Sequence, residues 1–555
     1  MNDEPVDTTD VTDADSRSRL DRREFVRVAV AAAASGTLGT TAVVAQGRGG
    51  AAGAPGGQQE APPLRPLGNG EPPALVFQAY PGGTGAYMER LALERGREAF
   101  ERTPIEVPSW NGPLPTADAE IAFLPVHRLA ALIRARAISP VELTEIYLDR
   151  LKRYDPVLLC AVEILEDRAR AEARESEAEL SAGVYRGPLH GIPYGLKDLF
   201  AIRGARTTWG SGDFENRVID YDSEVAVRLR EAGAILVAKL ATGLFAQGDN
   251  WYRGQTKNPW NLAQGSSGSS AGPASATAAG CVAFGIGTET QGSIVSPTIR
   301  CGLSALRPTF GRVSRHGGMV LAWSMDKVGP ICRTIEDCAL VFNAIHGADP
   351  KDPATLTSPF QWQRDAALSR FRIGYDERAP ETFVETLREL GAAPVPMPDR
   401  PDSRGISQLG VESAAAFEEY VNSLPPEPDP EPADTAGGRG GRGGGGGSRG
   451  RFTRGRETSA LEFLQSHRRR HLLMLEMAEL MEDFDMYVAG GGDVGLTNQT
   501  GHPAAVLPYT FGGDEPHQPR CTTIIGNLFA DDHILTVAHA YQRVTDWHTR
   551  QPTLP

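Results

Sequence analysis

Apolar positions recur at helical spacing in several stretches of the chain, and short apolar runs lie between them. The segment Ser139-Pro140-Val141-Glu142 has the pattern of a capping box with proline at the first helical position, and apolar residues follow on one helical face up to Tyr154. Residues 223–233 predict a second helix, which leads into a short apolar strand at 235–237. Helix and strand therefore alternate, which is typical of an α/β fold.

The same alternation continues toward the C-terminus. The small residues of 271–279 predict a tightly packed helix, and the apolar run 281–284 predicts a buried strand. Farther on, 460–484 has the periodicity of a helix and 486–488 that of a strand. We therefore expect one α/β domain over 117–555.

Two tracts rich in glycine and proline interrupt this pattern. Residues 47–116 predict a flexible extension, and 425–457 predict a disordered insertion, because neither tract has the apolar residues that a core needs. The second tract contains Arg-Gly-Gly repeats and Phe452, which could bind RNA through charge and stacking. We favour a flexible surface insertion, since the tract is short and adjoins its own acidic run.

The first 46 residues have the composition of an export signal. Arg22 and Arg23 open a basic region, and the weakly apolar, alanine-rich run 28–45 follows it. This run contains serine and threonine residues that a membrane-spanning helix would not favour. Residues 1–46 resemble a twin-arginine (Tat) signal peptide, so we expect an exported protein, periplasmic or extracellular, without stable membrane insertion.

Composition narrows the classes of function. The chain has 555 residues, of which 40% are hydrophobic and 23% charged, and this excludes a collagen-like or wholly disordered protein. Its 56 Lys and Arg against 70 Asp and Glu give a formal net charge of −14, which disfavours nucleic acid as a partner. The six cysteines form no CxxC pair, so neither a disulfide framework nor a zinc site is expected.

Lysine is scarce, and one lysine lies in an apolar setting. The chain has only six lysines, so nearly all of its positive charge is arginine. Arginine stays protonated in proteins, whereas burial can neutralise a lysine and make it a base. Lys197, inside the apolar stretch 191–200, is the best candidate for such a base. Lys239 is its rival, but it is better explained as a structural ammonium group bonded to carbonyls.

Two further segments supply hydroxyl groups. Residues 265–272, GSSGSSAG, combine serines with glycines that allow another chain segment to come close. Residues 287–294, GTETQGSI, have successive backbone N–H groups that could form an oxyanion-binding nest beside a serine. No segment is specific alone, but together they indicate a base, a proton carrier and a nucleophile.

In this order and spacing the three segments resemble the amidase signature family of serine hydrolases. The likeness continues in SPVEL (139–143), GPLHGIP (187–193), TTWGS (207–211), NPWN (258–261), LRPTFGRVS (306–314) and GHP (501–503). The resemblance implies the amidase signature fold over 117–555. In that fold a mixed central sheet is flanked by helices as an α/β/α sandwich.

Carried over residue by residue, the resemblance implies a Ser-Ser-Lys triad. In it Ser293 is the nucleophile, Ser269 the bridging serine and Lys197 the base, and a cis peptide bond joins Gly268 to Ser269. No metal and no organic cofactor is expected, because a neutral lysine can take the part of a histidine.

The resemblance also implies the remaining parts of the site. Backbone N–H groups form the oxyanion hole, and they belong to Thr290, Gln291, Gly292 and Ser293. Side chains suited to an apolar or aromatic acyl group are candidates for the substrate pocket: Trp209, Tyr252, Met319 and Trp323. The expected partner is a small-molecule amide, cleaved to an acid and ammonia or an amine, and a homodimer is compatible with the sequence.

The third segment departs from the more usual family text, GTDTGGSIR. Glu289 stands in place of the aspartate, Gln291 in place of a glycine and Val295 in place of the arginine. The form GTETxGSIVxP is closer to bacterial peptide amidases than to the fatty-acid or tRNA-linked branches. The triad is intact, so the departures leave the substrate open.

Other functions compete with an amidase. The A-type chain of a glutamine-dependent tRNA amidotransferase shares the triad, although an export signal argues against it. A non-catalytic binding protein on an amidase scaffold is a second alternative, and an ester hydrolase a third, because an acyl-enzyme route also opens esters.

Two other motif matches are weaker. Gly268-x-Ser270-x-Gly272 fits a nucleophile elbow, but no strand is predicted before it. Ser324-Met325-Asp326-Lys327 fits SxxK, yet no SDN or KTG sequence follows. We therefore give neither a catalytic role.

Overall fold

The computed structural model describes the chain from residue 79 onward, with short gaps. The described residues are 79–80, 83–406, 408–425, 452, 454–513 and 517–555. The chain divides into Met1–Pro73 and Ala74–Pro555, and all described residues belong to the second unit. The export signal expected at 1–46 lies outside them. None of the described helices has both the length and the apolar character that crossing a bilayer requires.

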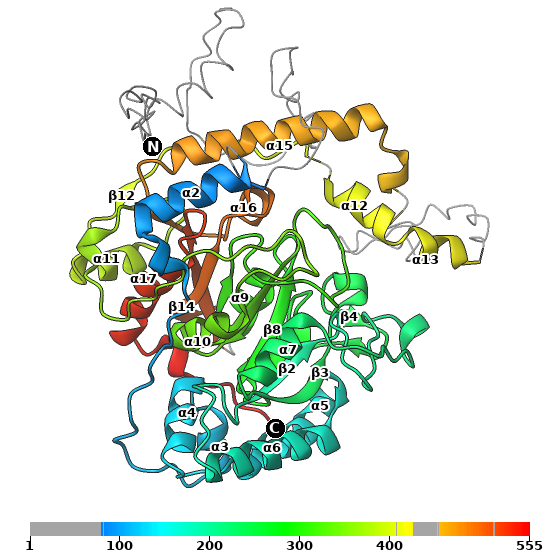
Figure 1. Ribbon diagram of the computed structural model, residues 1–555, viewed down its shortest axis with the longest axis vertical. Coiled ribbons are helices and arrows are strands. Elements are labelled where there is room, and N and C mark those ends of the chain that lie inside the picture. The colour runs from blue at the N-terminus through cyan, green and yellow to red at the C-terminus, as the bar shows by residue number, and fades with distance from the viewer. Residues whose placement is uncertain (1–78, 81–82, 407, 426–451, 453, 514–516) are drawn as a thin grey trace, which may run out of the picture. The chain divides into compact units, whose positions relative to one another are not determined.

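An eleven-stranded mixed sheet forms the centre of this unit (Figure 1), in the order β1-β3-β2-β8-β10-β9-β14-β15-β13-β11-β12. Neighbouring strands are parallel from β3 through β2 to β8 and from β13 through β11 to β12, and antiparallel elsewhere. The strands are β1 (Ala161–Ile164), β2 (Pro193–Lys197), β3 (Ile235–Leu240), β8 (Phe284–Glu289), β9 (Ser304–Arg307), β10 (Lys327–Cys332), β11 (Ile373–Tyr375), β12 (Val395–Pro396), β13 (Met486–Ala489), β14 (Ala504–Gly512) and β15 (Gln518–Gly526).

Helices and two small hairpins complete the unit. The helices are α2 (Thr84–Arg95), α3 (Asp118–Ala122), α4 (Val126–Arg134), α5 (Pro140–Leu158), α6 (Glu166–Ser181), α7 (Glu224–Glu231), α8 (Ala271–Ala278), α9 (Val295–Cys301), α10 (Ile335–Ile345), α11 (Glu381–Glu389), α12 (Gln408–Ala416), α13 (Glu418–Ser423), α15 (Ala460–Leu480), α16 (Val494–Thr500) and α17 (Asp531–Arg543). The hairpins pair β4 (Asn250–Trp251) with β5 (Gly254–Gln255) and β6 (Lys257–Asn258) with β7 (Asn261–Gly265).

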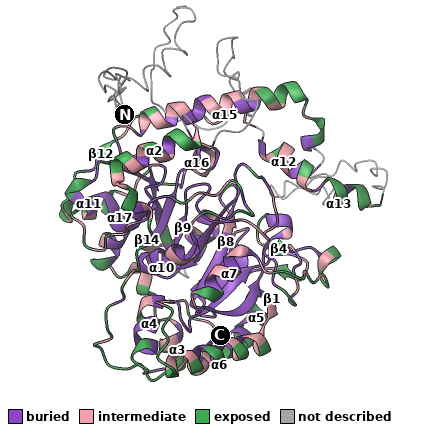
Figure 2. Ribbon diagram, viewed as in Figure 1, coloured by how far each residue is buried: buried purple, intermediate pink, exposed green. Residues whose placement is uncertain are grey.

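Both faces of the sheet are buried, as Figure 2 shows. In β14, Ala504 and Val506 pack into a core that α8, α9 and α15 share, whereas Ala505 and Leu507 pack into a core with α10 and α17. Successive side chains of a strand point to opposite faces, so a strand apolar on both must be covered on both. This confirms the predicted mixed sheet flanked by helices.

Most of the predicted elements are present. Ser139 Oγ accepts a hydrogen bond from the Glu142 backbone N–H (3.1 Å), and Glu142 Oε2 accepts one from the Ser139 N–H (2.9 Å), so the capping box at the start of α5 is confirmed. α7, β3, α8, α15 and β13 also lie where the pattern predicted elements. The strand expected at 281–284 is displaced, because β8 begins only at Phe284, where it meets Tyr194 of β2.

Part of the predicted flexible extension 47–116 is helical, so the prediction is wrong for that part. α2 and a 3-10 turn, Arg97–Phe100, occupy its C-terminal half. Tyr80 and Tyr87 pack against Phe529 with ring centroids 4.9 and 5.6 Å apart, and Leu91 joins the same cluster. These few apolar side chains attach the extension to the loop before α17.

The predicted insertion 425–457 also needs a correction at its C-terminal end. Phe452 is buried and stacks on Phe417, the residue before α13, at 4.2 Å, and a 3-10 turn follows at Arg454–Glu457. Phe452 is therefore a core residue rather than an exposed aromatic that could stack on a base. The Arg-Gly-Gly repeats lie outside the described residues.

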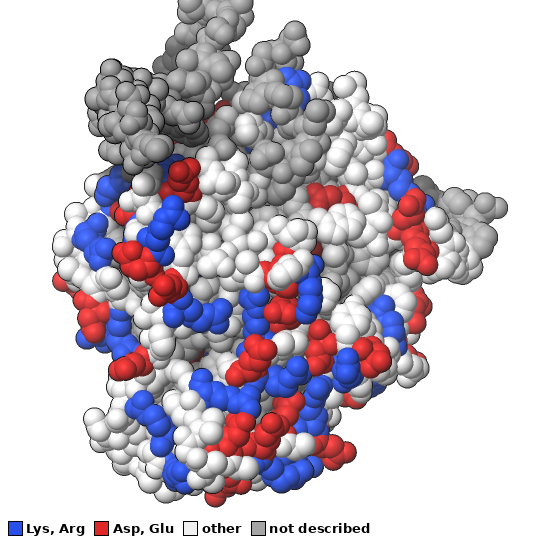
Figure 3. Space-filling view, viewed as in Figure 1, with Lys and Arg blue, Asp and Glu red and all other residues white. Residues whose placement is uncertain are grey.

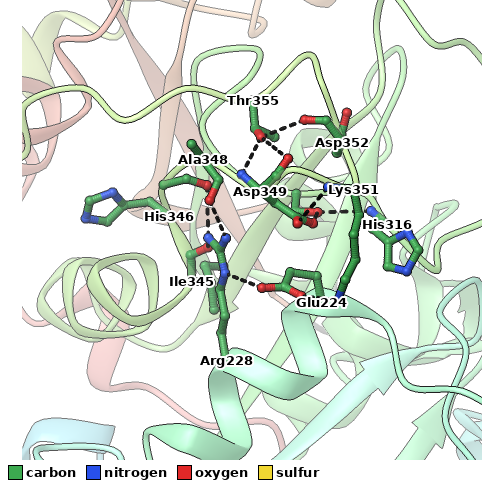
Figure 4. A network of polar contacts seen from close by, with 12 residues as sticks. Glu224, Arg228, His316, Ile345, His346, Ala348, Asp349, Lys351, Asp352 and Thr355 are labelled. Atoms are coloured by element: carbon green, nitrogen blue, oxygen red, sulfur yellow. Dashed lines mark hydrogen bonds and ion pairs between the residues drawn. The ribbon is translucent and has the colours of Figure 1, made fainter.

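Arg228 ties α7 to the end of α10 (Figure 4). Its guanidinium donates hydrogen bonds to the carbonyls of Ile345 (2.8 Å), Gly347 (3.0 Å) and Ala348 (2.9 Å), and its Nε donates to Glu224 (3.0 Å). The last carbonyls of a helix have no partner within the helix. Arg228 therefore satisfies the end of α10 and joins two helices over the sheet.

On the face drawn in Figure 3, basic and acidic side chains are interspersed and form no large patch of one sign. Such a surface offers a polyanion no continuous basic track. The exclusion of nucleic acid as a partner stays a prediction.

Candidate active site

Lys197 is the last residue of β2 and is fully buried, between the neighbouring strands β3 and β8. Its Nζ donates hydrogen bonds to Ser269 Oγ (2.8 Å), Ser270 Oγ (3.0 Å) and Thr288 Oγ1 (2.8 Å). Among the described residues, no carboxylate forms an ion pair with it. The lysine predicted as a base and the serine predicted as its bridge are thus in direct contact.

The surroundings of Lys197 favour the neutral amine. Burial holds the pKa of its ammonium well below the usual 10.5, and the nearby charges of Asp326 and Glu289 only partly oppose this effect. Desolvation disfavours the charged form of a lysine, so its proton is given up at lower pH. An amine with this pKa can accept a proton from a hydroxyl group.

The serine loop runs from β7 to α8 and packs closely against residues 248–249. The cis peptide bond expected between Gly268 and Ser269 is present. A Cβ atom on Gly268 would collide with the carbonyl of Gly248, so only glycine fits there. The Ser267 N–H donates to Asp249 Oδ2 (2.9 Å). These contacts determine where Ser269 presents its hydroxyl.

Glu289 organises the loop that carries Ser293. It is buried at the end of β8, where its Oε2 accepts hydrogen bonds from the N–H groups of Ile294 (2.8 Å) and Val295 (2.9 Å). Its Oε1 accepts from Arg307 (3.0 Å) and Asn498 Nδ2 (2.7 Å). The Glu289 carboxylate thereby holds the C-terminal end of the Ser293 loop, where α9 begins.

Glu289 keeps its charge despite burial. Burial by itself would raise the pKa of this carboxyl group, but Arg307 and the hydrogen bonds from Val295 and Asn498 outweigh it, and the pKa lies below its usual range. A buried charge without such partners would be unstable. From the sequence Glu289 stood out only as a departure from the family text, and this role was missed. The one available signal was a carboxylate in an otherwise apolar strand.

The Ser293 loop lies beside the serine loop. The Ser270 N–H donates to the carbonyl of Ser293 (3.1 Å), and Ser293 itself is half-buried. The structure therefore brings together all three residues assigned to the triad: Lys197 bonds to Ser269, and the adjacent Ser270 bonds to Ser293.

Three backbone N–H groups in the Ser293 loop are free. Among the described residues, no acceptor bonds to the N–H of Gln291, Gly292 or Ser293. Thr290, the fourth predicted member of the oxyanion hole, is held by its side chain, because its Oγ1 donates to Asp326 Oδ1 (2.6 Å). Free N–H groups beside a serine have the chemistry of an oxyanion-binding site.

Asp326 links the Ser293 loop to residues 321–322. Its Oδ2 accepts hydrogen bonds from the N–H groups of Leu321 (2.8 Å) and Ala322 (3.1 Å), while its Oδ1 holds Thr290. The carboxylate is buried, and nothing in the sequence singled it out as part of the site.

A cavity of about 380 Å³ opens next to the Ser293 loop. Gln247, Gln291 and Leu321 form part of its wall, and α12, α16 and the segment before α12 form the rest. Helices α12 and α13 lie to one side of the sheet and α12 contacts α15 (Figure 1). The lining residues are Gln247, Gln291, Leu321, Ser403, Ile406, Leu409, Gly410, Ser413, Gly495 and Gln499.

None of the four predicted pocket residues lines this cavity, and their assignment to the substrate pocket stays a prediction. Trp209 and Met319 belong to an apolar cluster around Phe245, where Trp209 packs edge-on against Phe214 (5.5 Å). Tyr252 packs against Trp251, and Trp323 is 47% exposed. Periodicity could not distinguish core aromatics from pocket aromatics, because both occupy apolar positions.

The competing motif residues have structural partners. A strand, β7, does precede Ser270, contrary to the prediction, but Ser270 is buried and its Oγ donates to the Thr288 carbonyl (3.1 Å). Ser324 Oγ accepts from Arg470 (2.6 Å) and donates to Glu412. Neither hydroxyl is free to act as a nucleophile.

The rival lysine also has a structural role, as predicted. Lys239 Nζ donates to the Arg206 carbonyl (2.8 Å) and to Thr207 Oγ1 (3.0 Å), and it forms an ion pair with Asp198 (2.8 Å). The ammonium group of Lys239 is therefore bonded to three structural partners.

Comparison with known proteins agrees with this arrangement. The profile of the Amidase family matches residues 142–397. The A-type chain of the glutamyl-tRNA(Gln) amidotransferase from Roseiflexus sp. (strain RS-1) is 34% identical over 477 residues, which cover 77% of this chain and 97% of that protein. The native peptide amidase of Stenotrophomonas maltophilia has a similar structure, with a TM-score of 0.64, 27% identity and coverage of 77% of this chain and 98% of that chain.

A solved 6-aminohexanoate cyclic dimer hydrolase shares the fold at 20% identity, with a TM-score of 0.65 over 78% of this chain and 99% of that chain. The matches extend over nearly the full length of each of these relatives. The chain therefore belongs to the amidase signature family, and it is a hydrolase of the kind that acts on C–N amide bonds.

Proposed function

We propose that the protein hydrolyses a carboxamide through a Ser-Ser-Lys triad and an acyl-enzyme, and releases an acid and ammonia or an amine. The observation that carries this proposal is the buried Lys197, whose partners are three hydroxyl groups and the Thr288 carbonyl and whose pKa is lowered by burial. A lysine in this state is a base, and it lies in contact with Ser269.

Acylation uses the contacts of the site in sequence. Ser293 Oγ attacks the amide carbonyl carbon and its proton passes to Ser269, whose own proton passes to Lys197 Nζ. The free N–H groups of Gln291, Gly292 and Ser293, with that of Thr290, stabilise the negative oxygen; one such donor typically contributes about 3 kcal/mol. The C–N bond then breaks as the proton returns through Ser269 to the leaving nitrogen.

Deacylation repeats the same steps with water. Water attacks the ester carbonyl of the acyl-enzyme and gives up a proton through Ser269 to Lys197. The tetrahedral intermediate collapses, the acid leaves, and Ser293 regains its proton.

Covalent labelling tests the triad directly. A fluorophosphonate should add once to Ser293 of the purified protein, as located by intact mass and peptide mapping. Ser293→Ala should abolish the adduct, and Lys197→Ala and Ser269→Ala should slow its formation strongly. Ser296→Ala, in the first turn of α9, is the matched control and should label like wild type. An adduct elsewhere, or equal labelling of Lys197→Ala, contradicts the assignment.

The second candidate is a component of a tRNA-dependent amidotransferase. It is favoured by the 34% identity to the glutamyl-tRNA(Gln) amidotransferase chain of Roseiflexus. Hydrolysis of carboxamides by the isolated chain, without tRNA or partner proteins, supports the amidase. Glutamine turnover that appears only with such partners supports the alternative.

Export also belongs to this proposal. Its support is the pair Arg22-Arg23 before the weakly apolar run 28–45. A reporter fused to residues 1–46 should reach the periplasm of a bacterium, and replacing both arginines by lysine should keep it in the cytoplasm.

A further inference from the structure

The backbone of Ser267 is unusual, two residues before the bridging Ser269. Its φ is 61°, in the left-handed region that residues other than glycine rarely adopt. Such a conformation is energetically costly and persists only where the surrounding groups hold it. An ordinary φ at this position would turn the chain that leads to Ser269 and move its hydroxyl away from Lys197 Nζ, which now lies 2.8 Å from it. The rate of the proposed reaction therefore depends on what holds Ser267.

The carboxylate of Asp249 holds the N–H group of Ser267 from outside the serine loop. Its Oδ2 accepts the hydrogen bond from that N–H (2.9 Å) and packs on Gly265, where a Cβ atom would collide with it. Its Oδ1 accepts hydrogen bonds from the side-chain amides of Gln255 (3.2 Å) and Asn250 (3.4 Å). The carboxylate thus connects the serine loop to the hairpin of β4 and β5.

Backbone hydrogen bonds connect the same two segments. The Asp249 carbonyl accepts from the Thr256 N–H (3.0 Å), and the Thr256 carbonyl accepts from the Ser266 N–H (2.9 Å). Inside the serine loop, Ser266 Oγ donates to the Ser267 carbonyl (2.9 Å). Of these contacts, only the bond from the Ser267 N–H ends on a side chain of another segment. A substitution of Asp249 therefore removes that bond and leaves the backbone bonds in place.

The segment that carries Asp249 is itself fixed. Phe245 and Ala246 also have left-handed φ values, 47° and 59°. Phe245 is buried and packs against Phe417, with ring centroids 5.2 Å apart. Residues with such φ values cluster at functional sites, where packing holds them. An aromatic core therefore fixes the segment from which Asp249 reaches the serine loop.

We propose that Asp249 is a positioning residue: it holds Ser267 in the left-handed conformation and so directs the hydroxyl of Ser269. This inference rests on the proposed amidase function and concerns the same site. Asp249 acts as a hydrogen-bond acceptor rather than as a charge, because its side-chain partners are neutral N–H groups. It is also not among the charges that act on Lys197.

The kinetics of fluorophosphonate labelling of Ser293 test this role. In Asp249→Ala, the labelling rate constant at saturating probe should fall by about tenfold to 100-fold, because a hydroxyl displaced by about 1 Å transfers protons poorly. The probe concentration for half-saturation should change by less than about twofold, since Asp249 does not line the cavity. Asp249→Asn keeps an acceptor, so it should label within about threefold of wild type and keep the acid limb of the pH–rate profile.

The Ser269→Ala variant shows whether Asp249 acts through the bridging serine. In that background, Asp249→Ala should slow the residual labelling by less than about twofold, because the hydroxyl that it positions is gone. Ser267→Gly should recover at least about fivefold of the rate lost in Asp249→Ala, since glycine adopts a left-handed φ without strain. A residue that only stabilises the fold would give neither result.

Two further variants control for stability. Asp222→Ala is the matched control, because Asp222 likewise accepts a backbone N–H, that of Arg203 (2.8 Å), and lies outside the site. It should label within about twofold of wild type. Asp249→Leu removes the acceptor in a side chain of similar branching, and it replaces Asp249→Ala if that variant does not fold. Thermal unfolding shows that each variant is folded.

The outcomes separate the inference from the proposed function. Labelling of Asp249→Ala like wild type, no recovery in Asp249→Asn or with Ser267→Gly, or an equal loss in the Ser269→Ala background overturns the inference alone. Absence of Ser293 labelling in the wild type overturns the proposed amidase function and the inference with it.

Discussion

At the scale of single residues, burial determines the chemistry of this site. Lys197 is surrounded by hydroxyl groups, whereas Lys239, equally buried, has Asp198 as a counter-ion. Burial lowers the pKa of both, and Asp198 partly restores that of Lys239. Only the first lysine is therefore well suited to act as a base.

The pH dependence of activity should report Lys197. Because its pKa in the folded protein is lowered, the amine is protonated and inactive at low pH and becomes neutral well below pH 10.5. We expect kcat/KM to rise with pH along a limb of unit slope. Lys197→Met should lower kcat/KM by about 10²-fold to 10⁴-fold and remove this limb. A limb that survives in Lys197→Met would assign the titration to another group.

Asp326 should shift that limb through its charge. Its carboxylate favours protonated Lys197 and so raises the lysine pKa against the effect of burial. Asp326→Asn removes this effect, so the acid limb should move to lower pH in a pH–rate profile.

The control for Asp326→Asn is Asp337→Asn. Asp337 is buried and paired with His127 (2.9 Å), and it is not among the charges that act on Lys197. This variant should leave the limb in place. A shift of equal size in both variants would mean that the effect is general destabilisation.

At the scale of elements, the residues of the site lie at the ends of strands and at the start of a helix. Lys197 ends β2, Glu289 ends β8, and Ser293 lies just before α9. β2 and β8 are adjacent and parallel, so their C-terminal ends meet at one edge of the sheet. The pairing of these two strands brings together residues that are far apart in the sequence.

Arg228 gives a test of how helices are joined. It donates to the carbonyl of Ile345, the last residue of α10, and to those of Gly347 and Ala348 just beyond the helix, and it is largely buried. Hydrogen bonds from charged groups contribute roughly 1.5–3 kcal/mol, so Arg228→Met should lower the free energy of unfolding by about 2–3 kcal/mol. Arg203→Met is the matched control, since Arg203 is 66% exposed, and its effect should stay below about 0.5 kcal/mol in denaturant unfolding. Equal losses would refute the role of Arg228.

At the scale of the whole molecule, the described part of the N-terminal region packs onto the body of the unit. Tyr80, Tyr87 and Leu91 are buried against Phe529. Removal of 1–73 should leave the melting temperature within about 1 °C, because that stretch has no predicted core.

Removal of 1–100 should be strongly destabilising. It takes away the buried side chains of Tyr80, Tyr87 and Leu91, each contributing about 1.5–3 kcal/mol. The two truncations are compared by thermal unfolding at one protein concentration. Similar melting temperatures would show that α2 does not stabilise the unit.

The sequence by itself determined the α/β class, the capping box of α5 and the three segments that the resemblance joined into one site. These features depend on local periodicity or on a few residues at fixed spacing. They are independent of which other segments pack against them. The Lys197 contact with Ser269 therefore followed from the resemblance before any geometry was known.

Only the tertiary structure decided which apolar residues line a cavity and which fill a core. Trp209 and Met319 pack in the core, whereas Gln499 lies at the cavity wall. Phe452 and the α2 residues are buried because partners distant in the sequence, Phe417 and Phe529, cover them. The charge states of Glu289 and Lys197 also depend on distant groups, since burial and neighbouring charges exist only in the folded chain.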